Sequence, residues 1–400
     1  MKQLPRVFPV FIIALLAAAC SATTTNTSVE PGVQPAAQCK TDAECAGSAD
    51  KPVCDVPTGA CSALPPGSEI GHGDGTIASV TLTELYSVGA AAKLVDLSFD
   101  IGKPDVVWVV GYGDNSIHIG TGMDTETPTF KRIVDPAARH FMYKPPAIAT
   151  GSPTLWATCG DNDNSQNGKA NLFMGPATFT TDLAVLGQRT SGGLGSHFDM
   201  LHQSPNCRGI AHQANSVFWV FNDYDKSLDK YDFGKSHEPG GDDHSDGSIF
   251  RYAEGKVKGA TDGTPSHIFF DSEDNFLYVA DTGSKRILRL DTASGTKGGP
   301  LERTNEPLKD EGVMTGATLE VIVDAGVLEK PSGLEVRKGL IYVTDAATST
   351  FHVFDKTGKL LRSLDTGLPA GSLAGFAFGP ADKIYFTDKV AGRVLRIDPQ

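Results

Sequence analysis

The sequence predicts an all-β protein, a six-bladed β-propeller preceded by a small disulfide-rich module. From residue 76 onward no long amphipathic helical pattern occurs, whereas short apolar or alternating runs bounded by Gly, Asp, Asn and Pro recur throughout. One motif, an apolar run that ends in Asp and is followed by a turn, occurs six times. A unit of about 40 to 60 residues with four short strands is typical of a propeller blade.

The repeated motif sets the number of blades. Its copies lie 43 to 64 residues apart and end at Asp114, Asp161, Asp223, Asp281, Asp345 and Asp388. Short strands such as AIAT or GIAHQ precede the copies, and strands such as RILRLD or FHVFD follow them. Six blades therefore fit residues 76–400, with a pair of separate β-sandwiches as the alternative. We expect each repeated Asp to accept backbone N–H groups of the turn that follows it.

The ends of the repeat region predict how the ring closes. The last blade, from Leu373, supplies only three strands before Gln400, while SVTLTELYSV at residues 79–88 is a spare strand at the start. If that strand is the outermost one of the last blade, the ring closes and no sheet edge stays open. We therefore expect the N-terminal strand to complete blade six.

The first residues have the pattern of an export signal. Two basic residues precede an apolar stretch, residues 7–19, which is too short to span a bilayer, so residues 1–19 are expected to be a signal peptide. The sequence LAAAC at residues 16–20 resembles the bacterial lipobox, which implies a lipid on Cys20 that binds the membrane. The serine that follows would then imply sorting to the outer membrane of the cell envelope. Ordinary secretion is the alternative, and we expect residues 20–38 to form a flexible tether.

Export places the other six cysteines in an oxidising compartment, where an even number favours disulfides. Residues 39–62 enclose no core, and we expect them to form a two-disulfide module with a linker over residues 63–75. The spacing does not choose among the three pairings, and it lacks the C-x2-C pairs that structural zinc prefers. The cysteines of this module are Cys39, Cys45, Cys54 and Cys61.

The remaining two cysteines fall at a blade boundary. Cys159 lies at the end of the second predicted strand of blade two, and Cys207 lies just before the first strand of blade three. These positions are neighbours in a propeller, so we expect a Cys159–Cys207 disulfide, with two buried thiols as the alternative.

Charge and motifs limit the class of partner. The net charge of −13 argues against nucleic acid as a partner, and it favours cations. The chain has no P-loop, GxGxxG loop, HExxH motif or GxSxG elbow, so a nucleotide cofactor or a serine nucleophile is not expected. A small molecule or a protein on one face of the propeller remains as a partner.

Residues 197–247 are the least generic part of the chain. They hold five of the ten histidines, and GKSHEPGGDDHSDG at residues 234–247 is inserted between the third and fourth predicted strands of blade three. Imidazole and carboxylate are common metal ligands, so we expect a divalent metal site for zinc, copper or calcium. The alternative is a polar surface loop whose histidines have separate local roles. The candidate ligands are His202, His212, His244, His267 and Asp243.

Propeller topology sorts these candidates into groups. His202 precedes blade three and His267 begins blade four, so both are expected on the entry face near the channel, and His212 should point into the channel or a blade interface. The inserted loop with Asp243 and His244 joins strands three and four and belongs by default on the opposite face, toward the rim. Either the long loop folds back, or there are two separate groups. A second candidate, DNDNSQNG at residues 161–168, resembles a calcium loop without its central Gly and terminal Glu.

The repeat resembles the NHL and related six-bladed propeller families. PSHIFFDSEDNFLYVADTGSKRILRLD (residues 265–291) and the corresponding stretch at residues 331–358 carry the resemblance. SHFDMLHQSPNCRGIAH and GGDDHSDG are similar to segments of uncharacterised bacterial NHL-type proteins. A more distant resemblance links the chain to the zinc-dependent propeller lyase that splits peptidyl-hydroxyglycine, which implies a metal on the axis. The positions that match its zinc ligands are Arg208, Ser266 and Ser332, so the lyase activity is not carried over.

Three functional hypotheses follow. In the first, an envelope-anchored propeller uses its His and Asp site to bind a metal as a ligand-binding or sensing module. In the second, the same metal serves a lyase or hydrolase reaction. In the third, a metal-free propeller binds a protein. An open ligand position would favour the second hypothesis, a saturated site the first, and scattered histidines the third.

Overall fold

The computed structural model describes residues 39–47, 50–55, 58–151, 154–162, 172–241, 243–301 and 306–400. The chain divides into two compact units, residues 1–64 and 65–400, which are described separately. The predicted signal peptide, the tether and the proposed lipid attachment site Cys20 lie outside the described residues. Within the described residues, no helix is long and apolar enough to cross a membrane.

The first unit is held by two disulfides, as predicted. Its described elements are η1 (Asp42–Cys45), β1 (Val53–Asp55) and β2 (Ala60–Ser62). The strands pair antiparallel, with Cys54 opposite Cys61. The pairing that the sequence left open is Cys39–Cys54 and Cys45–Cys61, so these sulfurs are not available to bind zinc.

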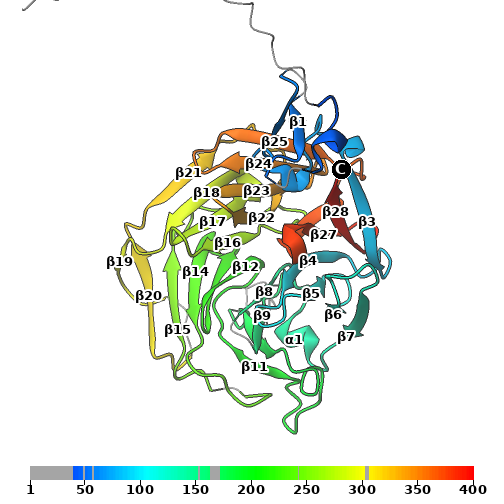
Figure 1. The fold of residues 1–400 in the computed structure, drawn as a ribbon. Coiled ribbons are helices and arrows are strands. Elements are labelled where there is room, and N and C mark those ends of the chain that lie inside the picture. The colour runs from blue at the N-terminus through cyan, green and yellow to red at the C-terminus, as the bar shows by residue number, and fades with distance from the viewer. Residues whose placement is uncertain are drawn as a thin grey trace, which may run out of the picture. The chain divides into compact units, whose positions relative to one another are not determined.

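The second unit is a six-bladed β-propeller, as predicted (Figure 1). Each blade is one antiparallel sheet. The blades are numbered in chain order, and the strands of each blade are given from the innermost to the outermost. Blade one contains β4 (Leu94–Phe99), β5 (Val106–Gly111), β6 (Ser116–Thr121) and β7 (Thr129–Ile133), and blade two contains β8 (Ile148–Thr150), β9 (Leu155–Thr158), β10 (Ala177–Thr180) and β11 (His197–Met200). Blade three contains β12 (Cys207–Ala214), β13 (Val217–Asn222), β14 (Ser227–Asp232) and β15 (Ser248–Tyr252).

The other three blades repeat the same order. Blade four contains β16 (Ile268–Asp271), β17 (Phe276–Asp281), β18 (Arg286–Asp291) and β21 (Leu319–Val323), and blade five contains β22 (Pro331–Arg337), β23 (Leu340–Asp345), β24 (Thr350–Asp355) and β25 (Leu360–Asp365). Blade six contains β26 (Leu373–Phe378), β27 (Ile384–Asp388), β28 (Arg393–Pro399) and β3 (Val80–Ser87). Short helices are η2 (Ser68–Ile70), η3 (Ile77–Ser79), α1 (Ala138–Phe141), η4 (Thr282–Ser284) and η5 (Pro380–Asp382).

The apolar runs form strands that are buried on both faces because neighbouring blades pack against each other. In β5 all six residues of VVWVVG are buried. Trp108, Trp156 and Trp219 occupy the second strands of blades one to three, and all are fully buried. The rings of Trp108 and Trp156 stack across the blade boundary with centroids 5.7 Å apart. Interlocked aromatic side chains thus form the core between blades.

The ring closes through the N-terminal strand, which confirms the prediction. β3 pairs antiparallel with β28, from Val80 opposite Pro399 to Ser87 opposite Arg393, and the two strands lie side by side in Figure 1. Residues just before β3 also belong to this unit. Ile70 is buried in a core cluster with residues of blades five and six, so the segment expected to be a linker packs on the propeller from residue 65.

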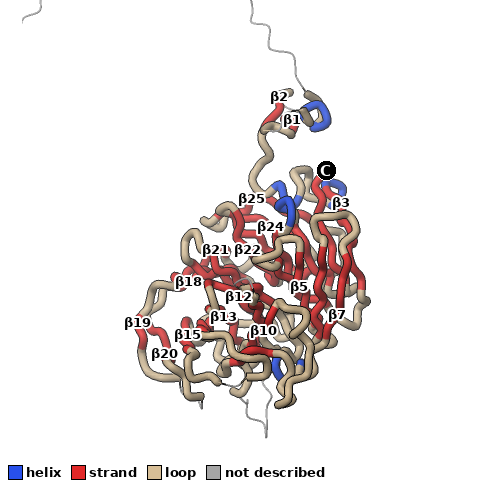
Figure 2. The backbone as a smooth tube through the Cα atoms, turned by 60° about the horizontal axis from the view of Figure 1, so that its bottom comes forward, coloured by secondary structure: helices blue, strands red, loops and turns tan. Residues whose placement is uncertain are grey.

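One feature of the sheets was not predicted. Residues 292–318, here called the blade-four insertion, separate β18 from β21 and contain β19 (Thr296–Lys297) and β20 (Asp310–Thr315). β20 leaves its own blade and pairs parallel with β15, so the sheet of blade three gains two outer strands. Figure 2 shows β19 and β20 at the outer edge of the propeller beside β15.

The disulfide predicted at the boundary of blades two and three is present. Cys159 and Cys207 are bonded, and their Cα atoms are 5.9 Å apart. Both residues are fully buried. The bond joins the second strand of blade two to the start of blade three, so it fixes one end of the histidine-rich stretch. The three disulfides together indicate an exported protein.

Candidate metal centre

The loop inserted between β14 and β15 folds back toward blade two. The N–H of Gly240 in this loop, the blade-three insertion (residues 234–247), donates to the carbonyl of His197 at the start of β11, at 2.7 Å. Lys309 of the blade-four insertion donates its N–H to the carbonyl of Gly247, at 2.9 Å. Two insertions and the edge strand of blade two therefore meet at one place.

Three side chains from these three segments converge there. His202 follows β11, His244 lies in the blade-three insertion, and Glu306 lies in the blade-four insertion. One ligand atom from each residue lies within 4.8 Å of the other two. Glu306 Oε1 contacts His202 Nδ1 and lies 2.9 Å from His244 Nδ1. The imidazole rings of His202 and His244 meet edge to face, with centroids 5.2 Å apart.

The His202 connection is held rigidly by its surroundings. The hydroxyl of Tyr231 donates to the carbonyl of His202 at 2.8 Å, and the guanidinium of Arg251 donates to the carbonyl of Gln203 at 2.8 Å. The ring of Phe173 stacks on the ring of His202 with centroids 3.8 Å apart. Gln203 has a positive φ of 86°, which tertiary contacts must hold in place.

A second group of ligand-type residues adjoins the first. His237 Nε2 lies 3.3 Å from Asp246 Oδ1 and 3.7 Å from Asp199 Oδ2. Asp199 Oδ1 in turn lies 3.9 Å from His244 Nε2. Asp199 is in β11, whereas His237 and Asp246 are in the blade-three insertion. The ring of His244 thus faces Glu306 with one nitrogen and Asp199 with the other.

The two carboxylates that face His244 have opposite electrostatic environments. Burial raises the pKa of Asp199 to about 7, although His244 and His237 partly oppose this shift. Burial also acts to raise the pKa of Glu306, but hydrogen bonds from His202 and His244 outweigh it and lower the pKa to about 2. Glu306 is therefore ionised at neutral pH.

Two of the other predicted ligands, His212 and His267, lie instead around the propeller axis. They line a cavity of about 200 Å³ with Asp96, Thr150 and Glu335, so that each of these inner-strand positions faces the channel. His267 Nε2 lies 3.1 Å from the carbonyl of Pro146, and His212 Nε2 lies 3.1 Å from the carbonyl of Asn215. Because a carbonyl only accepts, each Nε2 carries a proton, and only Nδ1 of each ring is left to bind a metal.

Burial determines the charge in the axial cavity. It lowers the pKa of His267 to about 4, raises the pKa of Glu335 to about 8, and raises the pKa of Asp96 well above its usual range. At neutral pH these shifts keep the imidazole of His267 neutral and favour the protonated form of Glu335.

Asp243 lies apart from both groups of ligand-type atoms. It is exposed, and hydrogen bonds from the side chain of Ser245 and from its N–H, the latter at 3.0 Å, lower the pKa of Asp243. Most of the second calcium candidate, residues 163–168, lies outside the described residues.

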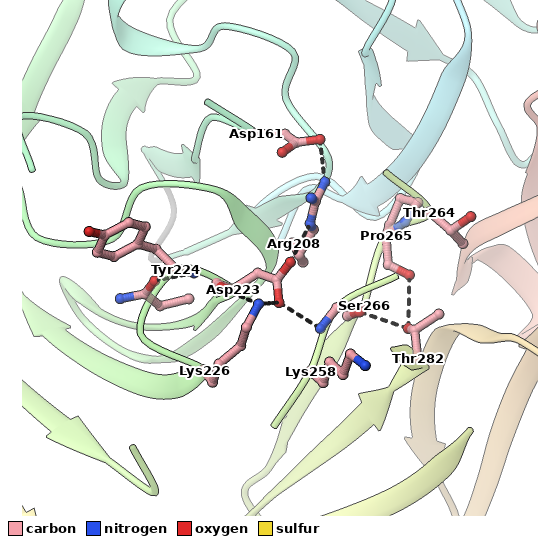
Figure 3. A network of polar contacts seen from close by, with 12 residues as sticks. Asp161, Arg208, Asp223, Tyr224, Lys226, Lys258, Thr264, Pro265, Ser266 and Thr282 are labelled. Carbon is pink, nitrogen blue, oxygen red and sulfur yellow. Dashed lines mark hydrogen bonds and ion pairs between the residues drawn. The ribbon is translucent and has the colours of Figure 1, made fainter. Parts of the chain in front are cut away.

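The repeated aspartates have structural contacts, but the expected bond from the turn that follows is present at Asp345 and Asp388 and not at Asp223 or Asp281. Asp223 accepts the N–H of Gly259 at 2.7 Å and the ammonium of Lys226 at 2.6 Å, and Arg208 lies between Asp223 and Asp161 (Figure 3). Asp281, Asp345 and Asp388 each accept backbone N–H groups from a neighbouring segment or turn. These carboxylates are locally satisfied, which leaves the His202 region as the main candidate site.

Sequence reasoning missed three members of this region. Glu306 stands in an insertion of a different blade, and no periodic signal connects that insertion to blade three. Asp199 occupies an edge strand of only four residues. His237 was counted in the histidine-rich stretch but not chosen, although its spacing to His244 and Asp246 within one loop could have suggested it.

Comparisons with known proteins show the fold. No protein-family model and no curated protein matches the sequence. Among solved structures, a streptogramin B lyase is 12% identical over 81% of this chain and 99% of its own, with a TM-score of 0.50. A protein of unknown function from Bacteroides thetaiotaomicron is 10% identical over 81% of this chain and 74% of its own, with a TM-score of 0.52.

A further structure from Bacteroides thetaiotaomicron is an auxiliary nutrient binding protein. It is 13% identical over 79% of this chain and 75% of its own, with a TM-score of 0.50. At such low identities the likeness shows the fold and no activity. Together with the six sheets and the closing strand, it confirms that this chain has a six-bladed β-propeller fold.

Proposed function

We propose that this protein is an envelope-anchored propeller that binds a divalent metal ion through His202, His244 and Glu306, and that it acts as a ligand-binding or sensing module. The observation that carries the proposal is the convergence of three ligand atoms within 4.8 Å of one another. Two imidazoles and one carboxylate suit zinc or copper better than calcium, which prefers oxygen ligands only.

The position of the three ligands supports a sensing role. They come from the connection between blades two and three, the blade-three insertion and the blade-four insertion, and a bound ion would join these segments. Because metal binding stabilises the state that holds its ligands in place, occupancy would stabilise this arrangement. The ion would then determine the shape of the surface that these insertions form.

The number of ligands supports a second candidate function. Three protein ligands leave one position of a tetrahedral zinc shell for water or a substrate atom, as in catalytic zinc sites. Zinc in such a site activates bound water or polarises a carbonyl, which would serve a lyase or hydrolase reaction. A small-molecule ligand is also in keeping with the nutrient-binding protein of similar fold.

Metal analysis of the purified full chain tests the proposal. We expect Glu306→Gln and His202→Ala to lose one equivalent of Zn²⁺ relative to the wild type, with circular dichroism confirming that each variant is folded. His212→Ala removes a histidine of the axial cavity and serves as the matched control, which should keep the full metal content. Unchanged zinc content in both site variants would refute the proposal and leave a metal-free, protein-binding propeller.

A second experiment separates binding from catalysis. Cobalt substituted for zinc reports its coordination through its visible absorption spectrum, so we would add azide to the cobalt protein. A spectral change would show a position open to an external ligand and favour the catalytic candidate. An unchanged spectrum would mean a saturated site and favour the sensing module.

Envelope anchoring rests on Cys20 and needs a separate test. We expect labelled palmitate to be incorporated into the wild type expressed in a Gram-negative bacterium, and the Cys20→Ala variant to remain unlabelled. Equal labelling of both proteins would contradict lipidation at this residue.

A further inference from the structure

We propose that a basic pocket on the entry face of the propeller binds a small organic anion that carries a phosphate group or several carboxylates. The entry face is the one where the inner strands begin and the second strands end. The pocket has a volume of about 480 Å³, within the range of about 300 to 1,000 Å³ that is common for small-molecule sites. Its lining includes Lys93, Asn115, Arg139, Tyr143, Lys144 and Asp262.

Three separate segments of the entry face form this basic pocket. Lys93 directly precedes β4, and Asn115 lies in the turn between β5 and β6. Arg139 belongs to α1, Lys144 lies between α1 and β8, and Asp262 lies between β15 and β16. The N–H of Lys144 donates to Asn115 Oδ1 at 2.8 Å. This bond joins blade one to the connection that leads into blade two, at the wall of the pocket.

Positive charge dominates this pocket, although acidic residues outnumber basic ones in the whole chain, 48 to 35. Three cationic side chains and one carboxylate line it. That carboxylate, Asp262, is paired with the ammonium of Lys330 at 2.7 Å and accepts two hydrogen bonds from Thr264. Its charge is therefore compensated before the three lining cations are considered.

The three cations that line the pocket have no carboxylate partner. Within the part of the chain that the structure describes, Lys93, Arg139 and Lys144 form no ion pair. Asp161, which follows the second strand of blade two, is bound instead by Arg208. A bound oxyanion would supply the negative charge that the protein does not place here.

A fourth cation adjoins the pocket and is only partly exposed. Lys389 follows β27 and interacts electrostatically with Lys93, Lys330 and Asp262. Burial lowers the pKa of Lys389, and the two other lysines lower it further, whereas Asp262 partly opposes the shift. A partly buried ammonium beside like charges is unfavourable, so an anion in the pocket would stabilise it.

The uncharged groups of the lining are hydrogen-bond donors. Asn115 Oδ1 is used by Lys144, so the amide N–H groups of Asn115 remain for a ligand. The hydroxyl of Tyr143 forms no hydrogen bond with any described residue. The guanidinium of Arg139 can donate to two oxygens of one phosphate or carboxylate, and the lysines act as point charges. A ligand that offers several acceptor oxygens fits this set.

The competing explanation is a solvated basic surface without a specific ligand. In that case each cation is hydrated separately, and dissolved anions screen the pocket without occupying it. The two explanations differ in whether binding is stoichiometric and whether it depends on single lining residues. Binding measured on matched variants therefore decides between them.

The test is isothermal titration calorimetry of the full chain with glycerol phosphate, with succinate and with glycerol. We expect one anion to bind per chain and uncharged glycerol not to bind, and the tighter of the two anions identifies phosphate or carboxylate as the preferred group. Arg139→Glu should weaken binding at least about tenfold, because a hydrogen bond to a charged group contributes that factor or more. Lys131→Glu is the matched control and should bind like the wild type, since Lys131 is an exposed cation of β7 outside the pocket.

The outcomes also separate this proposal from the metal site. Glu306→Gln should bind the anion like the wild type, because no residue of the lining is a proposed metal ligand. Failure of both anions to bind the wild type, or an effect of Arg139→Glu no larger than that of Lys131→Glu, would overturn the proposal in favour of a solvated surface. If Arg139→Glu does not fold, Lys144→Asn decides by the same comparison, since Asn tolerates the positive φ of 50° at this position.

Discussion

Replacing Asp229 should destabilise the propeller and loosen the candidate metal centre together. Asp229 is fully buried in β14, where its carboxylate accepts hydrogen bonds from Arg251 at 3.0 and 3.1 Å. Ser204, Ser227 and Asn222 donate to the same carboxylate at 2.8 to 2.9 Å. Arg251 and Asn222 also hold the carbonyl of Gln203, next to His202. One carboxylate thus organises the connection that presents His202.

The expected loss of stability follows from the buried charge of Arg251, which Asp229→Ala leaves without its main partner. Asp229→Ala would leave Arg251 buried with only Asp225 as an acidic partner, at 2.9 Å. Breaking a buried ion pair by removing one partner costs about 3 to 5 kcal/mol. The partner Asp225 retains part of the charge compensation, so we expect about 3 kcal/mol for this substitution.

Equilibrium unfolding in urea with a chelator present measures this cost without metal. Tryptophan fluorescence reports on the propeller, since all three tryptophans lie in its second strands. Arg251→Met combined with Asp229→Ala should recover part of the loss, because no unpaired charge is then buried. A cost below about 1 kcal/mol for Asp229→Ala, or no recovery in the double variant, would refute the reasoning.

Three further predictions concern the axis, the disulfide and the His202 connection. Burial raises the pKa of Glu335 from 4.5 to about 8, so the folded state holds a proton that the unfolded chain releases, and stability should fall between about pH 5 and 8. Because Glu335 is partly open to the cavity, we expect this proton to account for about 2 kcal/mol of the loss, and Glu335→Gln should remove that part. Urea unfolding at several pH values measures the effect, and an unchanged dependence of the free energy of unfolding on pH would contradict the prediction. Replacing both Cys159 and Cys207, 48 residues apart, by Ala should cost up to about 4 kcal/mol, measured by urea unfolding of both proteins without reductant. In Gly175→Ala the new Cβ would lie 1.9 Å from the carbonyl oxygen of Leu201, so we expect a loss of about 1 to 3 kcal/mol and weaker zinc binding by calorimetry, whereas wild-type values would show that the connection can shift.

The fold could be predicted because its signal is local and repeated. Each second strand, such as FLYVAD or LIYVTD, is an apolar run that ends in Asp, and six copies of this motif predict six blades. The closing strand β3 followed from a count of strands, since blade six supplies only three. By contrast, β20 has no equivalent strand in the other blades. Its parallel pairing with β15 joins segments that are distant in the sequence, and no repeated sequence pattern predicts it.

The candidate site was only partly predictable for the same reason. His202 and His244 were chosen from composition, and the structure places them together, but standard blade order alone had assigned the loop of His244 to the opposite face. The contacts of His244 with His202 and Glu306 show instead that this loop reaches the connection after β11. Glu306 could not be chosen, because its proximity depends on the pairing of β20.

The location of the centre follows from what the axis can provide. In a propeller the inner strands bring one residue of each blade to the channel, and His212 and His267 reach it in this way. There, each histidine uses Nε2 as a donor to a carbonyl, and burial raises the pKa of the nearby acids Asp96 and Glu335. Each ring keeps Nδ1 for a metal, but a cation at the axis would have to displace the protons that burial favours on the two acids. The two insertions place the ionised Glu306 beside two histidines, and for this reason the metal site that we propose lies there.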